Sequence, residues 1–85
     1  MTVQIVYFAW VRERIGKPGE TVELAPEVAT VADLVRWLRA QGPEYEAAFA
    51  RPELVRAAID RSHVKPDTPI AGAREIAFFP PVTGG

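Results

Sequence analysis

The chain has 85 residues, a formal net charge of −1 at pH 7 and no cysteine, so it is expected to form one domain held together by a hydrophobic core alone. The lack of cysteine excludes disulfides, thiolate metal sites and a cysteine nucleophile, and the small net charge gives no electrostatic footprint for nucleic acid or an anionic membrane. No apolar stretch is long enough to span a bilayer and no signal peptide opens the chain, which predicts a cytoplasmic protein.

The first residues predict a β-hairpin. Residues 3–9 are rich in β-branched and aromatic side chains, as is typical of a strand. Residues 10–15 are expected to form a single helical turn, and the Gly-Lys-Pro-Gly sequence at 16–19 predicts a reverse turn. Residues 20–24 alternate between polar and apolar side chains, which indicates a second strand joined to the first by a longer loop.

The clearest predicted element is a helix that begins after Thr30. Four apolar side chains follow the i, i+3, i+4, i+7 spacing of a helix with one buried face: Val31, Leu34, Val35 and Leu38. Thr30 is a favourable N-cap, and Asp33 three residues later provides an acidic capping box and interacts favourably with the helix dipole. Gly42 followed by Pro43 predicts where this helix stops.

The second half of the chain predicts a short helix and further strands. Residues 43–51 are expected to form the short helix, which Pro52 ends, and residues 54–59 are expected to form a strand. Two prolines leave residues 63–70 with only a brief edge strand or an irregular turn. Residues 74–79 form the final predicted strand.

This element order predicts an α+β fold, in which one long helix packs across a mixed four- to five-stranded sheet. A helix separates the first and last strands in sequence, so these two can run parallel at the centre of the sheet, which is the outline of the ubiquitin-like β-grasp fold. We expect a β-grasp domain over residues 1–79 and an extended C-terminal tail over residues 80–85. The predicted core consists of Ile5, Tyr7, Val22, Leu24, Val31, Leu34, Val35, Leu38, Ile59, Ile76 and Phe78.

No catalytic or metal-binding pattern is evident in the sequence. His63 is the single histidine; without cysteine it cannot complete a typical zinc site, and as a general base it would need an orienting partner. The acidic residues are scattered, and Glu20 is among those expected to face solvent. Trp10 and Trp37 are interpreted as core or rim packing. We therefore expect no metal ligands and no self-sufficient enzyme.

The C-terminal end, Phe-Phe-Pro-Pro-Val-Thr-Gly-Gly at residues 78–85, is the most informative segment. Two terminal glycines have no side chain to bury, but they offer an unhindered α-carboxylate on a thread that can enter a narrow channel in another protein. A frayed terminus is the alternative explanation of the glycines alone; the stiff Phe-Pro-Pro segment before them favours a presented, functional end. The carboxylate is ionised at neutral pH, so a partner must activate it, most simply as an acyl-adenylate formed with ATP, before it can accept sulfur or an amine.

The residues before the glycines are suited to insertion into a partner. Pro80 and Pro81 hold an extended stem, which lowers the ordering cost of insertion. From Phe79 to Gly85 the stem reaches about 20 Å at ~3.3–3.6 Å per residue. Because Phe79 alternates with Phe78, one ring is expected in the core and the other is available for docking.

Two segments of the chain resemble one known family. The ending Ile-Ala-Phe-Phe-Pro-Pro-Val-Thr-Gly-Gly at 76–85 is similar to the C-terminal signature of the small subunit of molybdopterin synthase. Val-Tyr-Phe-Ala at 6–9, followed by Val-Arg-Glu at 11–13, resembles that family's first strand and the turn after it. The resemblance covers essentially the whole chain in length and element order.

The resemblance implies a sulfur carrier whose Gly85 is adenylated by an E1-like activating enzyme and converted to a thiocarboxylate, with a sulfurtransferase as sulfur donor. The loaded tail would insert into the large subunit of the synthase, where sulfur passes to precursor Z (cyclic pyranopterin monophosphate). No cofactor would be bound; the sulfur is covalent, and ATP is used by the activating enzyme. Beside the reacting Gly85, the implied partner-binding residues are Phe79, Pro80, Pro81, Val82, Thr83 and Gly84.

Two alternatives stay open at this point. A terminal Gly-Gly alone also matches sulfur carriers of thiamin synthesis and tRNA thiolation, and ubiquitin-like protein modifiers. The alternative of another class is a non-catalytic interaction module whose Pro-Pro tail binds an aromatic groove. This last alternative predicts that the two terminal glycines are dispensable.

Overall fold

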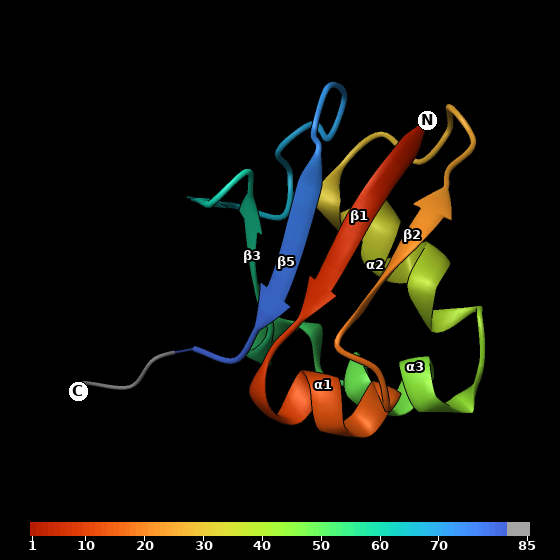
Figure 1. Cartoon of the computed structure of the whole chain (residues 1–85), viewed down its shortest axis with the longest axis vertical. Helices are drawn as coiled ribbons and strands as arrows, with labels where there is room; N and C mark the ends of the chain where they lie inside the picture. Colours follow the sequence, from red (N-terminus) through yellow and green to blue (C-terminus); the bar gives the residue numbers. More distant parts are fainter. Residues whose placement is uncertain (82–85) are drawn as a thin grey trace.

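The computed structural model describes residues 1–81, which form a mixed five-stranded sheet with helices on one side. The elements in chain order are β1 (Thr2–Tyr7), α1 (Ala9–Ile15), β2 (Gly19–Glu23), α2 (Val31–Arg39), α3 (Pro43–Ala48), the 3₁₀ turn η1 (Pro52–Leu54), β3 (Arg56–Ile59), β4 (Ser62–Val64) and β5 (Glu75–Phe79). The strand order is β2-β1-β5-β3-β4. The central strands β1 and β5 run parallel (Figure 1), which confirms the predicted pairing of the first and last strands.

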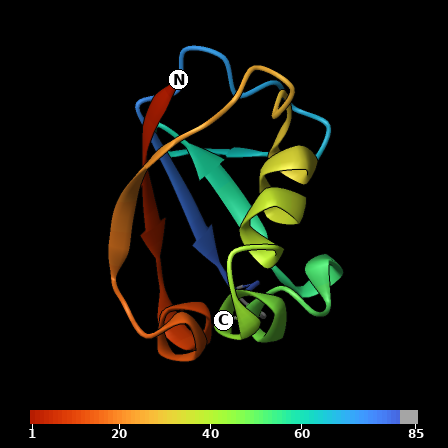
Figure 2. The same ribbon diagram turned by 90° about the vertical axis from the view of Figure 1, so that its right-hand side faces the viewer.

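The three α-helices of the described residues cover one face and one end of the sheet. Figure 2 shows α2 alongside one face, with α1 and α3 together at the end where β1 and β5 finish. The expectation of one long helix is only approximate, since α2 has nine residues and α1 has seven instead of a single turn. Two buried side chains one turn apart, Val11 and Ile15, anchor α1 to the core, and Gly16 ends it with a left-handed φ of 89°.

The predicted capping box of α2 is confirmed. The Asp33 backbone N–H donates to the Thr30 hydroxyl oxygen at 3.1 Å, and the Thr30 backbone N–H donates to the Asp33 carboxylate at 3.1 Å. The predicted stop was placed too late, because Ala40 caps the helix. Gly42 and Pro43 instead begin α3, where proline at the first position has no amide to leave unpaired.

The remaining strands are shorter than predicted. The strand expected from residue 54 begins at Arg56, because the chain first makes the 3₁₀ turn η1 after Arg51. The segment 63–70 supplies only the brief β4 and an isolated bridge between Thr30 and Pro69, as its prolines predicted.

The core extends further toward the helical end of the sheet than predicted. Every residue of the predicted core packs in it, although Val22, Val35 and Ile59 are only partly buried. The buried side chains that the predicted list lacked are Val3, Val11, Ile15, Tyr45, Ala48, Phe49, Ala57, Ala58, Ile70, Ala73 and Ala77. Five of them lie on α1 or in and just after α3, short elements whose burial depends on contacts distant in sequence. No helix within residues 1–81 is long and apolar enough to cross a membrane.

Candidate functional site

The tail leaves the domain from the middle of the sheet. Strand β5 is hydrogen-bonded to β1 on one side and β3 on the other, and its last residue, Phe79, leads into Pro80 and Pro81. Beyond the ladder, the Phe8 N–H donates to the Phe78 carbonyl at 3.0 Å, so the start of α1 is fixed beside the exit point (Figure 1). The predicted site residues Val82, Thr83, Gly84 and Gly85 lie outside the described residues.

The two phenylalanines at the end of β5 point to opposite faces, as their alternation predicts. Phe78 is 1 % exposed and packs edge-on against Phe49, with ring centroids 5.2 Å apart. Phe79 is partly buried on the other face, where its ring lies 5.0 Å from that of His63. The exposed His63 therefore covers one side of Phe79. That Phe79 docks onto a partner stays a prediction.

The face of the sheet away from the helices carries an apolar row that leads to the tail. Strand register places Val6 beside Ala77, and Ala77 beside Ala58. Both alanines are buried, so the accessible part of this row comes from its larger side chains. Phe8 continues the outward alternation of β1 and is 48 % exposed. We call Val6, Phe8, Ala58, Ala77 and Phe79 the exit face.

The exit face could have been found in the sequence only in part. The period of two in β1 already directs Val6 and Phe8 away from the core. The neighbours that complete the face depend on strand register, which one sequence does not provide. Strand β2 begins at Gly19, a residue expected in the turn, where it pairs with Val6 of β1. This close pairing favours glycine, because a Cβ at position 19 would lie 2.6 Å from the Ile5 carbonyl oxygen.

The expectation that Glu20 faces solvent is wrong. The hydroxyls of Tyr7 and Tyr45 both donate to its Oε2, at 2.7 and 2.6 Å, and the Lys17 ammonium lies 3.4 Å from its Oε1. Register places Glu20 opposite Ile5, on the inward side of β2. The same alternation that predicted Val22 as inward could have indicated this position. We call Glu20, Tyr7, Tyr45 and Lys17 the Glu20 cluster.

The electrostatics of the Glu20 cluster favour a structural role. Burial raises the pKa of Glu20, but hydrogen bonds from Tyr45 and Tyr7 and the charge of Lys17 outweigh it, so the pKa lies below its ordinary value. Burial and the hydrogen bond to Glu20 raise the pKa of Tyr7. The ionised carboxylate therefore accepts a hydrogen bond from each tyrosine hydroxyl, which joins β1, β2 and α3. Within residues 1–81 no three acidic or histidine side chains gather as a metal site.

Comparison with known proteins gives relatives along the whole chain. The molybdopterin synthase sulfur carrier subunit of Escherichia coli (strain K12) is 36% identical over 83 residues, covering 98% of this chain and 99% of the relative. The protein of the same name from Haemophilus influenzae is 31% identical over 83 residues, with the same coverage. These matches confirm the resemblance to small subunits of molybdopterin synthase.

Solved structures share the fold. A putative molybdopterin converting factor, subunit 1, from Pyrococcus furiosus has a TM-score of 0.74 at 26% identity, covering 96% of this chain and 99% of that one. A complex of subunits 1 and 2 of molybdopterin-converting factor from Helicobacter pylori contains a chain with a TM-score of 0.64 at 16% identity, covering 100% of both chains. At this identity the likeness concerns the fold alone. The ubiquitin-like β-grasp prediction is confirmed. The model of the ThiS family matches residues 5–85, and the chain belongs to that family.

Proposed function

We propose that this chain is a sulfur carrier and the small subunit of molybdopterin synthase. The observation that carries the proposal is the match along 98% of the chain to two relatives that bear this name. The position of the tail supports it: Phe79 ends a central strand, and only a short stretch of sequence separates it from Gly84-Gly85. The same stretch contains Pro80 and Pro81, whose fixed φ angles favour an extended stem.

The reacting group of the proposal is the α-carboxylate of Gly85. A carboxylate oxygen attacks the α-phosphorus of ATP on an E1-like activating enzyme, which releases pyrophosphate and forms an acyl-adenylate. Hydrosulfide, released when a thiol reductant reduces the persulfide of a sulfurtransferase, then attacks the carbonyl carbon, AMP leaves, and a thiocarboxylate remains. The sulfur finally passes to cyclic pyranopterin monophosphate on the large subunit, and water supplies the oxygen that restores the free carboxylate. Gly84 keeps side-chain bulk out of the partner's channel throughout.

The exit face is the docking surface in this proposal. Its exposed ring, Phe8, and its partly buried ring, Phe79, lie where the tail begins. A partner that covers these apolar side chains while it receives the tail gains hydrophobic contact close to its reaction centre. The large subunit of the synthase is the proposed occupant when sulfur is transferred, and the activating enzyme is the occupant when the tail is loaded.

The proposal is tested at the end of the chain with two variants, one that lacks Gly85 and one that carries an added alanine after it. Both should fold normally and bind the large subunit, because they leave residues 1–81 unchanged. The deletion displaces the reacting carboxylate by about 3.3–3.6 Å, well beyond the ~1 Å misplacement that already costs about a hundredfold in rate. The added alanine converts the intended carboxylate into an amide.

Both variants are incubated with the activating enzyme, ATP and a sulfur source. Thiocarboxylate is measured by intact mass, as one oxygen replaced by sulfur, and molybdopterin by its fluorescent oxidation product. Neither product should form. Near wild-type product from either variant contradicts the proposal and favours the interaction module, in which the glycines are dispensable. Restored molybdoenzyme activity in a carrier-deficient strain separates this pathway from thiamin synthesis, tRNA thiolation and protein modification.

A further inference from the structure

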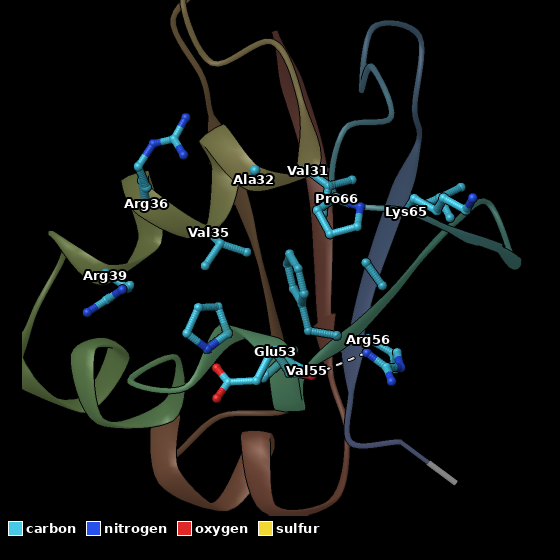
Figure 3. A pocket seen from close by; sticks show the side chains of 14 residues that line it. Val31, Ala32, Val35, Arg36, Arg39, Glu53, Val55, Arg56, Lys65 and Pro66 are labelled. Atoms are coloured by element: carbon cyan, nitrogen blue, oxygen red, sulfur yellow. Dashed lines mark hydrogen bonds between the residues drawn. The ribbon is translucent and has the colours of Figure 1, made fainter.

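We propose that the groove between α2 and the start of β3 binds a small amphipathic anion, with an apolar body and a single carboxylate at one end. The groove has a volume of about 530 Å³, within the range of about 300–1,000 Å³ usual for small-molecule sites. Figure 3 shows it open between the helix and the strands. At its strand edge Arg56 pairs with Phe79 in the strand register, so the rim of the groove borders the exit face.

The floor of the groove is apolar and partly exposed. It is formed by Val31 and Val35 of α2, Val55 and Ala57 at β3, Val64 of β4 and Phe78 of β5. Three of these side chains, Val35, Val55 and Val64, pack against the core yet remain partly accessible. In Figure 3 the Val35 side chain points into the space from the helix. An apolar ligand body would remove this surface from water.

Basic side chains lie on both sides of the groove, but the described acidic residues pair only with those on the helix side. On the helix side, Arg36 pairs with Asp33, and Arg39 donates twice to Glu46, at 3.0 and 2.7 Å. On the strand side, neither Arg56 nor Lys65 makes an ion pair with any described carboxylate.

The hydrogen bonding of Arg56 leaves its charge available to a ligand. Its guanidinium donates to the Glu53 backbone carbonyl at 3.2 Å. The Glu53 carboxylate itself lies 3.4 Å from Arg51. An anionic head beside Arg56 and Lys65 would supply the charge that the rim lacks.

The backbone around the groove favours a small ligand over an added peptide strand. Ala57 of β3 pairs with Val64 on one side and Phe78 on the other. The first amides of α2 are also used: Val31 N–H donates to the Thr68 carbonyl at 3.1 Å, and Ala32 N–H donates to the Pro66 carbonyl at 2.9 Å. Recognition by strand addition needs free main-chain groups. The groove offers apolar contact and charge at one edge, which fits a ligand whose polarity is confined to one end.

The test is a backbone-amide NMR titration of the full chain with sodium decanoate below its micelle concentration. Saturable shifts are expected to be largest at Val35, Val55 and Val64 and smallest at Val6 and Phe8, which lie at the end of β1, away from Arg56. Decyltrimethylammonium, which has the same alkyl chain and the opposite charge, should bind much more weakly. The double variant Arg56→Gln/Lys65→Gln should raise Kd about three- to tenfold.

The matched control is Arg12→Gln/Arg74→Gln, which removes two exposed cations elsewhere and should leave Kd unchanged. The amide spectrum of each variant verifies its fold. Absence of saturable shifts overturns the proposal, as does equal binding of the two amphiphiles or a set of shifts that is largest at Val6 and Phe8. Occupation of the groove by an acidic amphipathic helical peptide but not by decanoate also overturns it, in favour of a protein partner.

Discussion

Phe79 joins two environments, because it ends the central strand of the sheet and begins the tail. Its ring is partly buried against His63, whereas the neighbouring Phe78 is enclosed in the core. Removing the Phe79 ring therefore takes away less packing than removing that of Phe78. The Phe79 ring is therefore expected to contribute less to the stability of the fold than the Phe78 ring.

We expect Phe79→Ala to weaken binding to the large subunit or the activating enzyme more than it lowers the free energy of unfolding. Phe78→Ala is the matched control and should destabilise the domain by about 3–5 kcal/mol, as buried phenylalanines do. Urea unfolding and isothermal titration calorimetry measure the two effects. If binding and stability fall in proportion for Phe79→Ala, the residue belongs to the core and not to a docking surface.

Glu20 links two tyrosines that come from different elements, β1 and α3. Glu20→Ala should lower the free energy of unfolding by about 1–3 kcal/mol, because the hydroxyls of Tyr7 and Tyr45 lose their shared acceptor. Glu20→Gln keeps an acceptor oxygen and should cost less. Glu13→Ala, on the exposed side of α1, should stay within about 0.5 kcal/mol of the wild type. Equal urea midpoints for Glu20→Ala and Glu13→Ala would show that the cluster contributes nothing.

Among the elements, α2 has the strongest local signals, and its start agrees with the prediction. Its amphipathic spacing and its capping box are encoded within a few residues, so Thr30 and Asp33 could be assigned from sequence alone. The parallel pairing of β1 with β5 was also predictable, because an intervening helix permits it. These two features are enough to define the fold family.

The features that sequence reasoning missed depend on contacts between distant segments. The helix α1 is stable only because Val11 and Ile15 find a core that α3 helps to build. The inward position of Glu20 is favourable because the Tyr45 hydroxyl of α3 donates to its carboxylate, and the sequence alone does not show this contact. The exit face likewise needs the register that places Ala58 beside Ala77. The C-terminal tail could therefore be predicted from the sequence, but the exit face beside it could not.

The packing of α2 across the sheet is tested by truncating its buried side chains. Leu34 and Leu38 are both 0% exposed, so Leu34→Ala or Leu38→Ala should each cost about 2–5 kcal/mol. Gln41→Ala, at an exposed position just after the helix, serves as control. Thermal unfolding followed by circular dichroism gives the comparison. An unchanged melting temperature for both leucine variants is incompatible with the helix-on-sheet arrangement.

For the molecule as a whole, stability should fall in acid. Hydrogen bonds hold the pKa of Glu20 below its ordinary value, and the backbone amides of Ala29 and Thr30 do the same for Asp33. The unfolded state therefore binds more protons than the folded state around the ordinary carboxyl range of about pH 4. The stability that these two ionised carboxylates contribute is fully present above that range. It is lost as the pH falls through the pKa values that Glu20 and Asp33 have in the folded state.

Urea unfolding between about pH 7 and about pH 3 should show this decline. Glu20→Gln should reduce its steepness, because position 20 no longer titrates. A stability that is flat or rises toward acid pH would contradict the assigned direction of both pKa shifts.

The parallel pairing of β1 with β5 also determines how the domain bears mechanical load. The N-terminus and the tail leave the sheet at opposite ends (Figure 1), and β5 is hydrogen-bonded along both of its edges. If a force acts on the tail, it is directed along β5. The hydrogen bonds to β1 and β3 lie across this direction and bear the force together. A hairpin peeled from an edge would instead lose its bonds one at a time. A pull applied at the end of β5 is therefore opposed by the ladder bonds on both edges together.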